Sequence, residues 1–351
     1  MSKIRVLVVE DSLTVRKRLC EVLATDPEIE IVAEAENGKR GVELCEEHRP
    51  DVITLDLILP IMTGLTATEY IMAHFPTPVL IVSASTNRGE LYKTYDALAA
   101  GAVDVLEKPR GDETDEMWSE NFLAMVKLVS RIKVITHPRA KLGGYAPLSS
   151  SAPPAGVVSA RNTGNTRVIA IGASTGGPSA IVDVLRAIPA GAPVAILVVL
   201  HIDEPFGSAF AEWLDDQTAH HVAYARGGEV MDAPGVLMAP PGRHMVIENG
   251  RVKLHNGPER HSCRPSIDVL FESLAKDCGK GVSACLLTGM GKDGARGLLE
   301  IRRAGGFTVA QDEATSIVYG MPREAALLNA ADLVLPLANI GAALARSTGR
   351  S

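Results

Sequence analysis

Short runs of β-branched and apolar residues alternate with helical patterns along the first third of the chain. Between Ile4 and Glu107, apolar residues such as Val15, Leu19 and Val22 recur at helical spacing between these runs. Runs that are apolar on both faces and separated by helices are typical of a parallel sheet covered on both sides. The pattern predicts a doubly wound α/β domain, whose five strands are expected at residues 4–9, 29–35, 51–57, 78–84 and 103–108.

A last helix and then a change of composition mark the end of this first domain. Helical spacing continues to about residue 135, with apolar residues at Phe122, Met125, Val126, Val129 and Ile132. From His137 to Thr166 the chain is rich in Pro, Gly, Ser and Ala, and such a segment buries too little apolar surface to order itself. The expected organisation is a first domain at residues 1–136, a flexible linker at 137–165 and a second domain at 166–351.

The alternation of strand and helix patterns returns in the second domain. One segment, residues 235–254, differs because it carries the turn signal Asn249-Gly250 between two alternating runs, and it predicts a β-hairpin region. We expect a second α/β domain with a parallel sheet and a hairpin. The runs predicted as strands of this sheet are residues 167–172, 194–200, 282–289 and 307–311.

Composition and charge exclude several classes of protein. The 351 residues carry a formal net charge of -7, which gives no basic field for a nucleic-acid backbone, so we expect no nucleic-acid partner. Five cysteines without a CxxC pair suit a reducing compartment. The longest apolar run, residues 192–200, is about half of the ~20 residues that span a membrane, so we expect no membrane insertion. The first residues lack a signal-peptide pattern, which predicts a cytoplasmic protein.

Polar residues lie at the ends of the strands expected in the first domain. Glu10 and Asp11 follow the first strand, and Asp56 lies in the third. Ser83 ends the fourth strand and Lys108 follows the fifth, so all five side chains are expected in one crevice. Carboxylates are ligands that Mg²⁺ prefers, and a carboxylate can attack a phosphoryl donor. The alternative interpretation is that these acids only cap and solvate the edge of the sheet.

These residues resemble the pattern of the response-regulator receiver family: an acidic pair, a central aspartate, a hydroxyl residue and a lysine before proline. Here the pattern reads Glu10-Asp11, Asp56, Ser83 and Lys108. The resemblance implies a flavodoxin-like fold, phosphorylation at Asp56, and Mg²⁺ held by Glu10, Asp11 and Asp56 during that step. It also implies that Ser83 and Lys108 neutralise and orient the phosphoryl oxygens.

Two positions depart from the receiver family. Val105 stands where many receivers carry an aromatic switch residue, and Thr63 replaces the aspartate often found before the glycine at Gly64. An aromatic rotamer switch is therefore not expected here. Phosphoryl chemistry itself needs neither residue.

A serine lies in a glycine-rich turn at the start of the second domain. Residues 172–176 read GASTG and fit the G-x-S-x-G pattern between a strand and a helix, with Ser174 at the centre. The free N–H groups of the helix N-terminus favour a developing oxyanion, as acyl transfer requires. Such a turn can also hold a phosphate, although the GK[ST] ending and the full GxGxxG spacing are absent. The motif alone leaves both interpretations open.

A serine nucleophile needs a base and usually an acid that orients the base. His201 directly follows the strand at 194–200, and Asp293 follows the strand at 282–289. Because Ser174 also follows a strand, the three side chains can converge at one edge of the sheet. The competing histidines lie in polar or hairpin segments and are interpreted as surface or structural residues: His220, His221, His244, His255 and His261.

Several longer segments resemble the catalytic domain of protein-glutamate methylesterases of the CheB family. They are GASTGGP, His201, RPSIDVLF, LTGMGKDGARG and QDEATSIVYGMPREA. The resemblance implies hydrolysis of glutamate γ-methyl esters on chemoreceptors, often with deamidation of receptor glutamines, and no metal for this step. The implied roles are nucleophile for Ser174, base for His201, orienting acid for Asp293, backbone oxyanion donor for Met290 and an assisting role for Thr175.

The sequence departs from this family just after the proposed base, where Asp203 and Glu204 form an acidic pair. Our hypothesis is that the pair raises the pKa of His201, so that activity needs a higher pH. Two segments have structural alternatives. RPSIDVLF can be a helix start whose apolar residues lie in the core. Arg264 and Ser266 of this segment either have a structural role or contact the substrate or the receiver. QDEATSIVYGMPREA can be a capped helix start or part of the active-site rim.

The two resemblances together imply a phosphorylation-regulated esterase for chemosensory adaptation, in which the unphosphorylated receiver covers the active-site face. The implied partners are a histidine kinase and the cytoplasmic methylated helices of a chemoreceptor. The alternatives are a receiver-gated scaffold that docks to a receptor array with little turnover, and an esterase of a non-motility chemosensory system. A DNA-binding response regulator is disfavoured by the acidic net charge.

Overall fold

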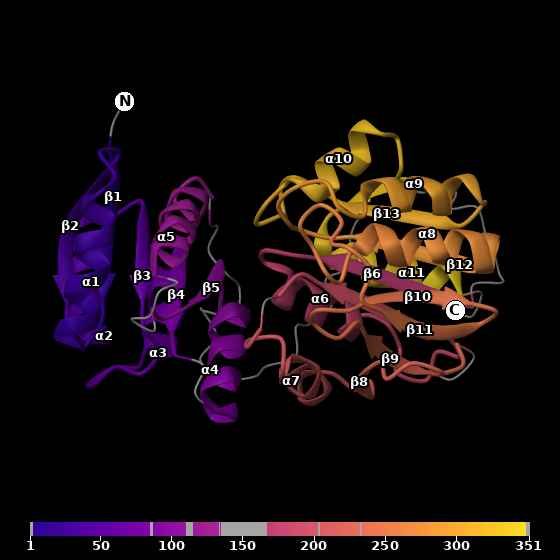
Figure 1. Ribbon diagram of the computed structural model, residues 1–351, viewed down its shortest axis with the longest axis horizontal. Helices are drawn as coiled ribbons and strands as arrows, with labels where there is room; N and C mark the ends of the chain where they lie inside the picture. Colours follow the sequence, from indigo (N-terminus) through magenta and orange to yellow (C-terminus); the bar gives the residue numbers. More distant parts are fainter. Residues whose placement is uncertain are drawn as a thin grey trace. The chain divides into compact units, whose positions relative to one another are not determined.

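The computed structural model describes residues 3–84, 87–109, 115–132, 134, 167–202, 204–231 and 234–348. The chain divides into two compact units, drawn in indigo to magenta and in magenta to yellow in Figure 1. The predicted linker at 137–165 lies outside the described residues, so the expected boundaries at 136 and 166 stay predictions.

The first unit contains the predicted five-stranded parallel sheet. Its strands have the order β2-β1-β3-β4-β5, which is the doubly wound order expected for a flavodoxin-like fold. Helices α1 and α5 contact each other, and α3 contacts both α2 and α4, so two groups of helices cover the sheet. The strands are β1 (Ile4–Val9), β2 (Ile29–Ala35), β3 (Val52–Leu55), β4 (Val79–Ser83) and β5 (Asp104–Glu107). The helices are α1 (Leu13–Ala24), α2 (Gly38–His48), α3 (Gly64–His74), α4 (Arg88–Ala99) and α5 (Asp115–Val129).

Side-chain caps explain where the helices of this unit begin. Ser12, Asn37, Thr63 and Asn87 each precede a helix, and each side chain accepts a hydrogen bond from a backbone N–H of the first turn. Thr63 therefore provides the cap of α3 although it replaces the aspartate common in receivers. At the other departure, Val105 is partly buried and packs against the apolar core of the sheet.

The second unit is built on a seven-stranded parallel sheet with the order β14-β13-β12-β6-β7-β9-β8. Its three central strands are fully buried, because α8 and α9 pack together and α6 packs with α11. Among the described residues, no helix combines the length and the apolar character that crossing a bilayer requires. The strands are β6 (Val168–Ala173), β7 (Ala195–Leu200), β8 (Val222–Tyr224), β9 (Gly235–Met238), β10 (His244–Glu248), β11 (Arg251–His255), β12 (Val282–Leu286), β13 (Phe307–Gln311) and β14 (Leu333–Leu335). The helices are α6 (Gly177–Arg186), α7 (Phe210–Gln217), α8 (Ile267–Cys278), the 3₁₀ turn η2 (Gly279–Gly281), α9 (Ala295–Arg303), α10 (Met321–Leu327) and α11 (Leu337–Ser347).

The region predicted as a hairpin divides between two sheets. Strands β10 and β11 form the antiparallel hairpin, and its turn residues Asn249 and Gly250 both have positive φ, as a two-residue turn requires. The first part of the same segment, β9, instead pairs in parallel with β7 and β8. The prolines at 240 and 241 separate the two runs because they cannot continue a sheet ladder.

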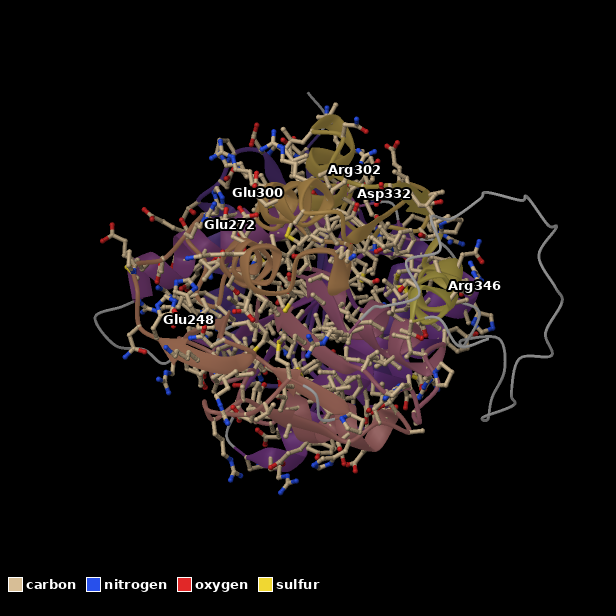
Figure 2. All side chains as sticks on the ribbon, turned by 90° about the vertical axis from the view of Figure 1, so that its right-hand side faces the viewer. Glu248, Glu272, Glu300, Arg302, Asp332 and Arg346 are labelled. Carbon is tan, nitrogen blue, oxygen red and sulfur yellow. The ribbon has the colours of Figure 1, made fainter. Side chains whose placement is uncertain are left out.

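The edge strand β14 was not predicted from the sequence, because its three residues are too short for a visible alternation. An ion pair between Arg302 Nε and Asp332 Oδ1, at 3.1 Å, attaches its start to α9. Figure 2 shows these two side chains next to each other on the surface of the unit. Asp332 also accepts hydrogen bonds from the backbone N–H and the hydroxyl of Thr308, so one carboxylate fixes the register of β14 against β13.

Gly64 offers a test of how tightly the first unit is packed beneath Asp56. A Cβ added at Gly64 would lie 2.1 Å from the Asp56 carbonyl oxygen and 2.7 Å from the Cα of Leu57. Because both neighbours are backbone atoms, Gly64→Ala is expected to destabilise this unit by about 1–3 kcal/mol. Faster hydrogen–deuterium exchange in peptides from residues 3–84 of the full chain would show the loss.

Gly89→Ala is the matched control for this experiment. Its Cβ would meet only Oδ1 of the Asn87 side chain, at 3.3 Å, and no backbone atom, and alanine favours the helix. Exchange in this variant should match or fall below that of the unchanged chain. Equal exchange in both variants would show that the contact at Gly64 is not tight.

Candidate active site

The first unit brings the predicted phosphoacceptor residues together at the carboxyl ends of β1, β3 and β5. The Lys108 ammonium lies 2.8 Å from Asp56 Oδ2 and 2.8 Å from Glu10 Oε2. Ligand oxygens of Glu10, Asp11 and Asp56 all lie within 4.8 Å of one another. Asp56 and Glu10 are buried, whereas Asp11 is exposed, so the crevice is open on the Asp11 side.

Buried polar atoms in this crevice lack partners and fit a cation and a phosphoryl group. Within the described part of the chain, Ser83 Oγ makes no hydrogen bond, and Glu10 Oε2 has only its charge contact with Lys108. Burial raises the pKa of Asp56 and of Glu10, and their contacts with Lys108 act in the opposite direction. A bound cation favours the ionised form of nearby carboxylates. Glu10, Asp11 and Asp56 are therefore suited to a cation that prefers oxygen ligands, such as Mg²⁺.

In the second unit, the Ser174 turn joins β6 to α6. Gly176 has a φ of +75°, a left-handed value that favours glycine, and it forms the N-cap of α6. An added Cβ at Gly289 would lie 2.6 Å from the Cβ of Ser174, so the following loop passes directly beside the serine. The serine is half-buried, and α6 begins three residues after it, as the G-x-S-x-G pattern predicts.

The register of the parallel sheet places His201 beside Ser174. Gly172 pairs with Val199 and Ala173 with Leu200, so Ser174 and His201 are the next residues of these two strands. The backbone N–H of His201 still donates to the Ala173 carbonyl, at 3.0 Å. On the other side, the Ser174 N–H donates to the carbonyl of Thr288, at 3.0 Å, which extends the pairing of β6 with β12. The strand on one side of Ser174 thus ends at the predicted base, and the loop after the strand on the other side carries the predicted acid.

Asp293 contacts the predicted base. His201 Nε2 lies 3.0 Å from Asp293 Oδ2, and the two side chains are 14% and 2% exposed. Burial alone would lower the pKa of His201, but its hydrogen bonds with Asp293 and Cys263 outweigh burial and raise the pKa to about 9. Since Asp293 engages Nε2, the imidazole nitrogen left for a serine proton is Nδ1.

The N-terminus of α8 holds the Asp293 carboxylate in place. Its two oxygens accept hydrogen bonds from Ser266 Oγ at 2.8 Å, from the Ile267 N–H at 2.7 Å and from the Asp268 N–H at 3.1 Å. Burial alone would raise the pKa of Asp293, but the hydrogen bond and charge of His201, with these donors, keep the pKa below its usual value. A carboxylate held by four donors has no freedom to turn, so it fixes the ring of His201.

The position of Ser266 contradicts the interpretation that this residue contacts the substrate or the receiver. Its side chain is fully buried, donates to Asp293 and caps α8 by accepting from the Val269 N–H at 3.4 Å. It therefore cannot contact a substrate or the receiver. Arg264 is partly buried, and its Nη1 donates to the Gly257 carbonyl at 3.2 Å.

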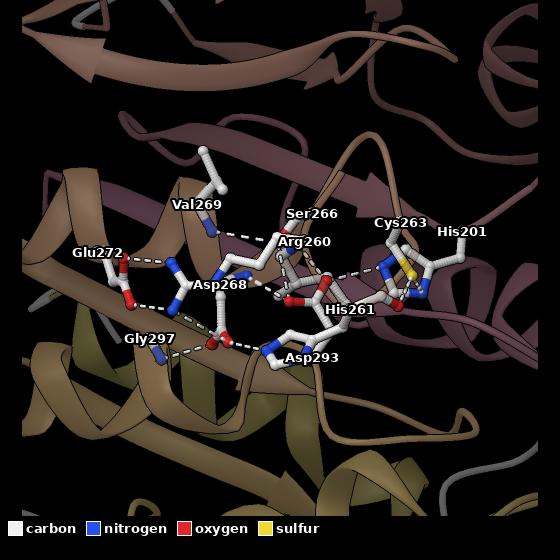
Figure 3. A network of polar contacts seen from close by, with 11 residues as sticks. His201, Arg260, His261, Cys263, Ser266, Asp268, Val269, Glu272, Asp293 and Gly297 are labelled. Carbon is white, nitrogen blue, oxygen red and sulfur yellow. Dashed lines mark hydrogen bonds and ion pairs between the residues drawn. The ribbon is translucent and has the colours of Figure 1, made fainter. Parts of the chain in front are cut away.

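Sequence reasoning missed a group of residues around His201 and Asp293, shown in Figure 3. Cys263 Sγ lies 3.6 Å from His201 Nδ1, and His261 Nε2 lies 3.2 Å from the buried Asp268 carboxylate. His261, interpreted above as a surface or structural residue, thus has a structural role: it contacts Asp268, whose N–H donates to Asp293. The only sequence signal was that His261 and Cys263 precede the RPSIDVLF segment. The contact between Cys263 and His201 depends on tertiary packing, because the two residues lie 62 positions apart.

The remaining expectations have mixed outcomes. His220 is structural, since its buried Nε2 contacts the carbonyls of Leu185 and Ile188, each at 3.0 Å. Asp203 lies outside the described residues, and the groups that raise the pKa of His201 are Asp293 and Cys263 rather than Glu204. Glu204 therefore does not account for the raised pKa, and the part of the hypothesis that concerns Asp203 stays a prediction.

The segment QDEATSIVYGMPREA lies beside the serine turn. Buried Gln311 accepts from the Thr288 N–H at 2.8 Å, and the Thr288 hydroxyl donates to the Thr175 carbonyl at 3.0 Å. The Ile317 side chain would be 2.8 Å from a Cβ added at Gly176. The segment therefore supports both the serine turn and the loop that carries Met290, whose side chain is 56% exposed.

Two family models match the chain. The CheB methylesterase model matches residues 169–344, and the response regulator receiver domain model matches residues 6–116. The catalytic domain of CheB methylesterase from Thermotoga maritima, a solved structure, is 32% identical over 51% of this chain and 97% of its own, with a TM-score of 0.49.

Curated relatives match over nearly the whole chain. One from Pseudomonas aeruginosa, named protein-glutamate methylesterase/protein-glutamine glutaminase 2, is 43% identical over 99% of this chain and 97% of its own length. Another from Nitrosospira multiformis, named protein-glutamate methylesterase/protein-glutamine glutaminase, is 41% identical over 97% of this chain and 96% of its own. This chain therefore belongs to the CheB methylesterase family and carries a response regulator receiver domain before its catalytic domain.

Proposed function

We propose that this chain hydrolyses γ-methyl esters of glutamate residues on chemoreceptors, releasing methanol, and that it also deamidates receptor glutamines. Family membership and the names of the relatives support the reaction class. The observation that carries the proposal is the 3.0 Å contact between His201, which follows β7, and Asp293, on the loop after β12. These two strands flank β6, which leads to Ser174, and a base oriented by a buried acid beside a half-buried serine is the arrangement that acyl transfer needs.

In the proposed first step, His201 Nδ1 accepts the hydroxyl proton while Ser174 Oγ attacks the ester carbonyl. The C–O bond to methoxide then breaks, and the proton on His201 passes to the leaving oxygen, which departs as methanol. Water next attacks the acyl-serine with His201 again as base, which frees the glutamate carboxylate and restores the serine. Asp293 stays ionised throughout and stabilises the imidazolium.

The oxyanion of each tetrahedral intermediate needs backbone donors near Ser174. We assign the Met290 N–H to this role, because the loop that follows β12 passes beside the serine. Thr175 assists at the same turn, where its carbonyl is fixed by the Thr288 hydroxyl. The positive end of α6 adds to the stabilisation of the charge.

Asp56 is the proposed phosphorylation site that controls the esterase. Its carboxylate attacks the phosphoryl group of a donor, and Lys108 and Ser83 neutralise and orient the transferred oxygens. Glu10, Asp11 and Asp56 would hold Mg²⁺, which offsets the negative charge of the donor and acceptor. A histidine kinase is the proposed donor and cytoplasmic receptor helices are the proposed substrate, so the chain is expected to act in the cytoplasm.

The first test is methanol release from a methylated chemoreceptor by the full chain. We expect Ser174→Ala to abolish release, and a small phosphodonor with Mg²⁺ to raise it in the unchanged chain. Asp56→Ala should keep the basal rate but show no rise, because it removes the attacking carboxylate.

A folding control and two possible outcomes decide between this function and the alternatives. Circular dichroism must show that both variants are folded. No methanol from several receptors, with receptor binding retained, would favour a receiver-gated scaffold. Release from receptors of a non-motility array alone would favour the other chemosensory system.

The pH dependence of the esterase tests the assignment of His201 as base. Because the folded pKa of His201 is raised to about 9, the imidazole is protonated at neutral pH and cannot accept the serine proton. We expect kcat/KM to rise about tenfold per pH unit below this pKa and to level off above it. Rates from Ser174→Ala give the spontaneous hydrolysis to subtract.

Glu204→Gln is the matched control for the origin of the pKa. If Asp293 and Cys263 set the pKa of His201, this variant leaves the lower limb of the profile unmoved, whereas Cys263→Ala shifts the limb to lower pH. A lower limb near the ordinary histidine value in the unchanged chain would contradict the assignment.

A further inference from the structure

We propose that Cys263 and His201 form a binding site for a thiophilic divalent cation such as Zn²⁺, and that occupation of this site switches the esterase off. The two side chains come from different parts of the sequence and meet only in the fold. The site uses Nδ1 of His201, the nitrogen assigned above to the serine proton. A bound cation therefore removes the base from the reaction.

The distance between the two donor atoms suits tetrahedral coordination. Cys263 Sγ and His201 Nδ1 lie 3.6 Å apart. Zinc binds cysteine sulfur at about 2.3 Å and histidine nitrogen at about 2.0–2.1 Å, and these bonds at a tetrahedral angle span about 3.6 Å. The separation of the two atoms therefore matches the span of these two bonds.

Hydrogen bonds already direct the free electron pairs of both atoms toward each other. His201 Nε2 faces Asp293, so the neutral ring carries its proton there and its lone pair at Nδ1. The Cys263 thiol donates to the His261 carbonyl at 3.3 Å, which leaves the sulfur lone pairs for Nδ1. Binding releases the thiol proton and, where the imidazole is protonated, the proton on Nδ1, since the metal takes the thiolate and the neutral imidazole.

Asp293 provides the support that metal-binding histidines usually have. A ligating imidazole commonly donates its other N–H to a carboxylate, which fixes the ring and strengthens it as a ligand. Asp293 accepts from His201 and is itself held by Ser266 and the N-terminus of α8. The acid that orients the base for catalysis therefore also orients it toward a metal.

A tight turn presents Cys263 to His201. Backbone hydrogen bonds join Arg260 and Cys263 in both directions, at 3.1 and 2.9 Å, and the two residues between them have φ values of +53° and +59°. The Arg260 guanidinium forms two 2.6 Å hydrogen bonds with the Glu272 carboxylate, which anchor the turn to α8, as Figure 3 shows. The sulfur is thus held in position before a metal arrives.

The donor set selects the kind of cation and the kind of site. Sulfur and imidazole nitrogen favour Zn²⁺ and Co²⁺ over Mg²⁺, whereas the carboxylates of the receiver crevice favour Mg²⁺. Both side chains are only partly buried, so water can complete the coordination. Two protein ligands with open positions fit a reversible inhibitory site rather than a structural one.

Co²⁺ is the probe for binding, because a cobalt–thiolate bond gives a near-ultraviolet charge-transfer band that oxygen ligands do not give. The full chain, kept reduced with a non-thiol reductant, is titrated with Co²⁺. We expect a saturable band that Zn²⁺ abolishes and that is missing in Cys263→Ser and in His201→Asn. Cys278→Ser is the matched control, because its thiol lies at the end of α8 beside Asp277, and it should keep the band.

Zn²⁺ is the probe for inhibition, and this part rests on the proposed esterase function. Zinc should abolish methanol release, a chelator should restore it, and Cys263→Ser should raise the half-inhibiting concentration by about tenfold or more. Each variant is compared with its own metal-free rate, and circular dichroism shows whether it is folded. Cys263→Ala serves as the second variant if the serine variant does not fold.

The two readouts separate the possible failures. A cobalt–thiolate band in a chain that releases no methanol would support the metal site and reject the esterase. The absence of the band in an active chain, or a band that survives in folded Cys263→Ser, would overturn the metal site. Equal zinc inhibition of the unchanged chain and Cys263→Ser would overturn its role in control.

Discussion

The hydrogen bond between His201 and Asp293 is the interaction on which the catalytic unit depends. A buried carboxylate is costly unless donors surround it, and the N-terminus of α8 supplies them through Ser266, Ile267 and Asp268. The helix thereby fixes the acid, and the acid fixes the imidazole by holding its Nε2 atom. The position of Asp293 therefore depends on how α8 packs against α9 and against β10 of the hairpin.

Each of the two units has its own parallel sheet, and in both the polar site residues lie at the carboxyl-terminal edge of that sheet. In each, strands that are buried on both faces end in polar residues, because their carboxyl ends are the places where the chain leaves the core. The receiver places three acids and Lys108 there, and the catalytic unit places Ser174, His201 and the loop to Asp293 there. Two different chemistries thus use one architectural rule.

The position of Cys263 gives the His201 imidazole two neighbours of opposite character. Asp293 holds Nε2 and stabilises positive charge on the ring, whereas the sulfur faces Nδ1, the nitrogen that the proposed reaction needs. The two contacts outweigh burial and raise the pKa of His201 to about 9. The same geometry that would make His201 a strong base thus also underlies the proposed competition by protons and thiophilic cations.

The sequence by itself determined most of the strands of the two parallel sheets, the strand-end residues and the motifs around Ser174 and Asp56, because hydrophobic periodicity and short turns are local properties. It also carried the family resemblance, since GASTGGP and LTGMGKDGARG are contiguous. Only the tertiary structure decided that β9 leaves the hairpin for the sheet, that Ser266 supports Asp293, and that Cys263 faces His201. The contacts of Ser266 and Cys263 join residues that lie 27 and 62 positions apart, and β9 had two possible sheets to pair with. No local sequence pattern encodes which of such distant partners meet.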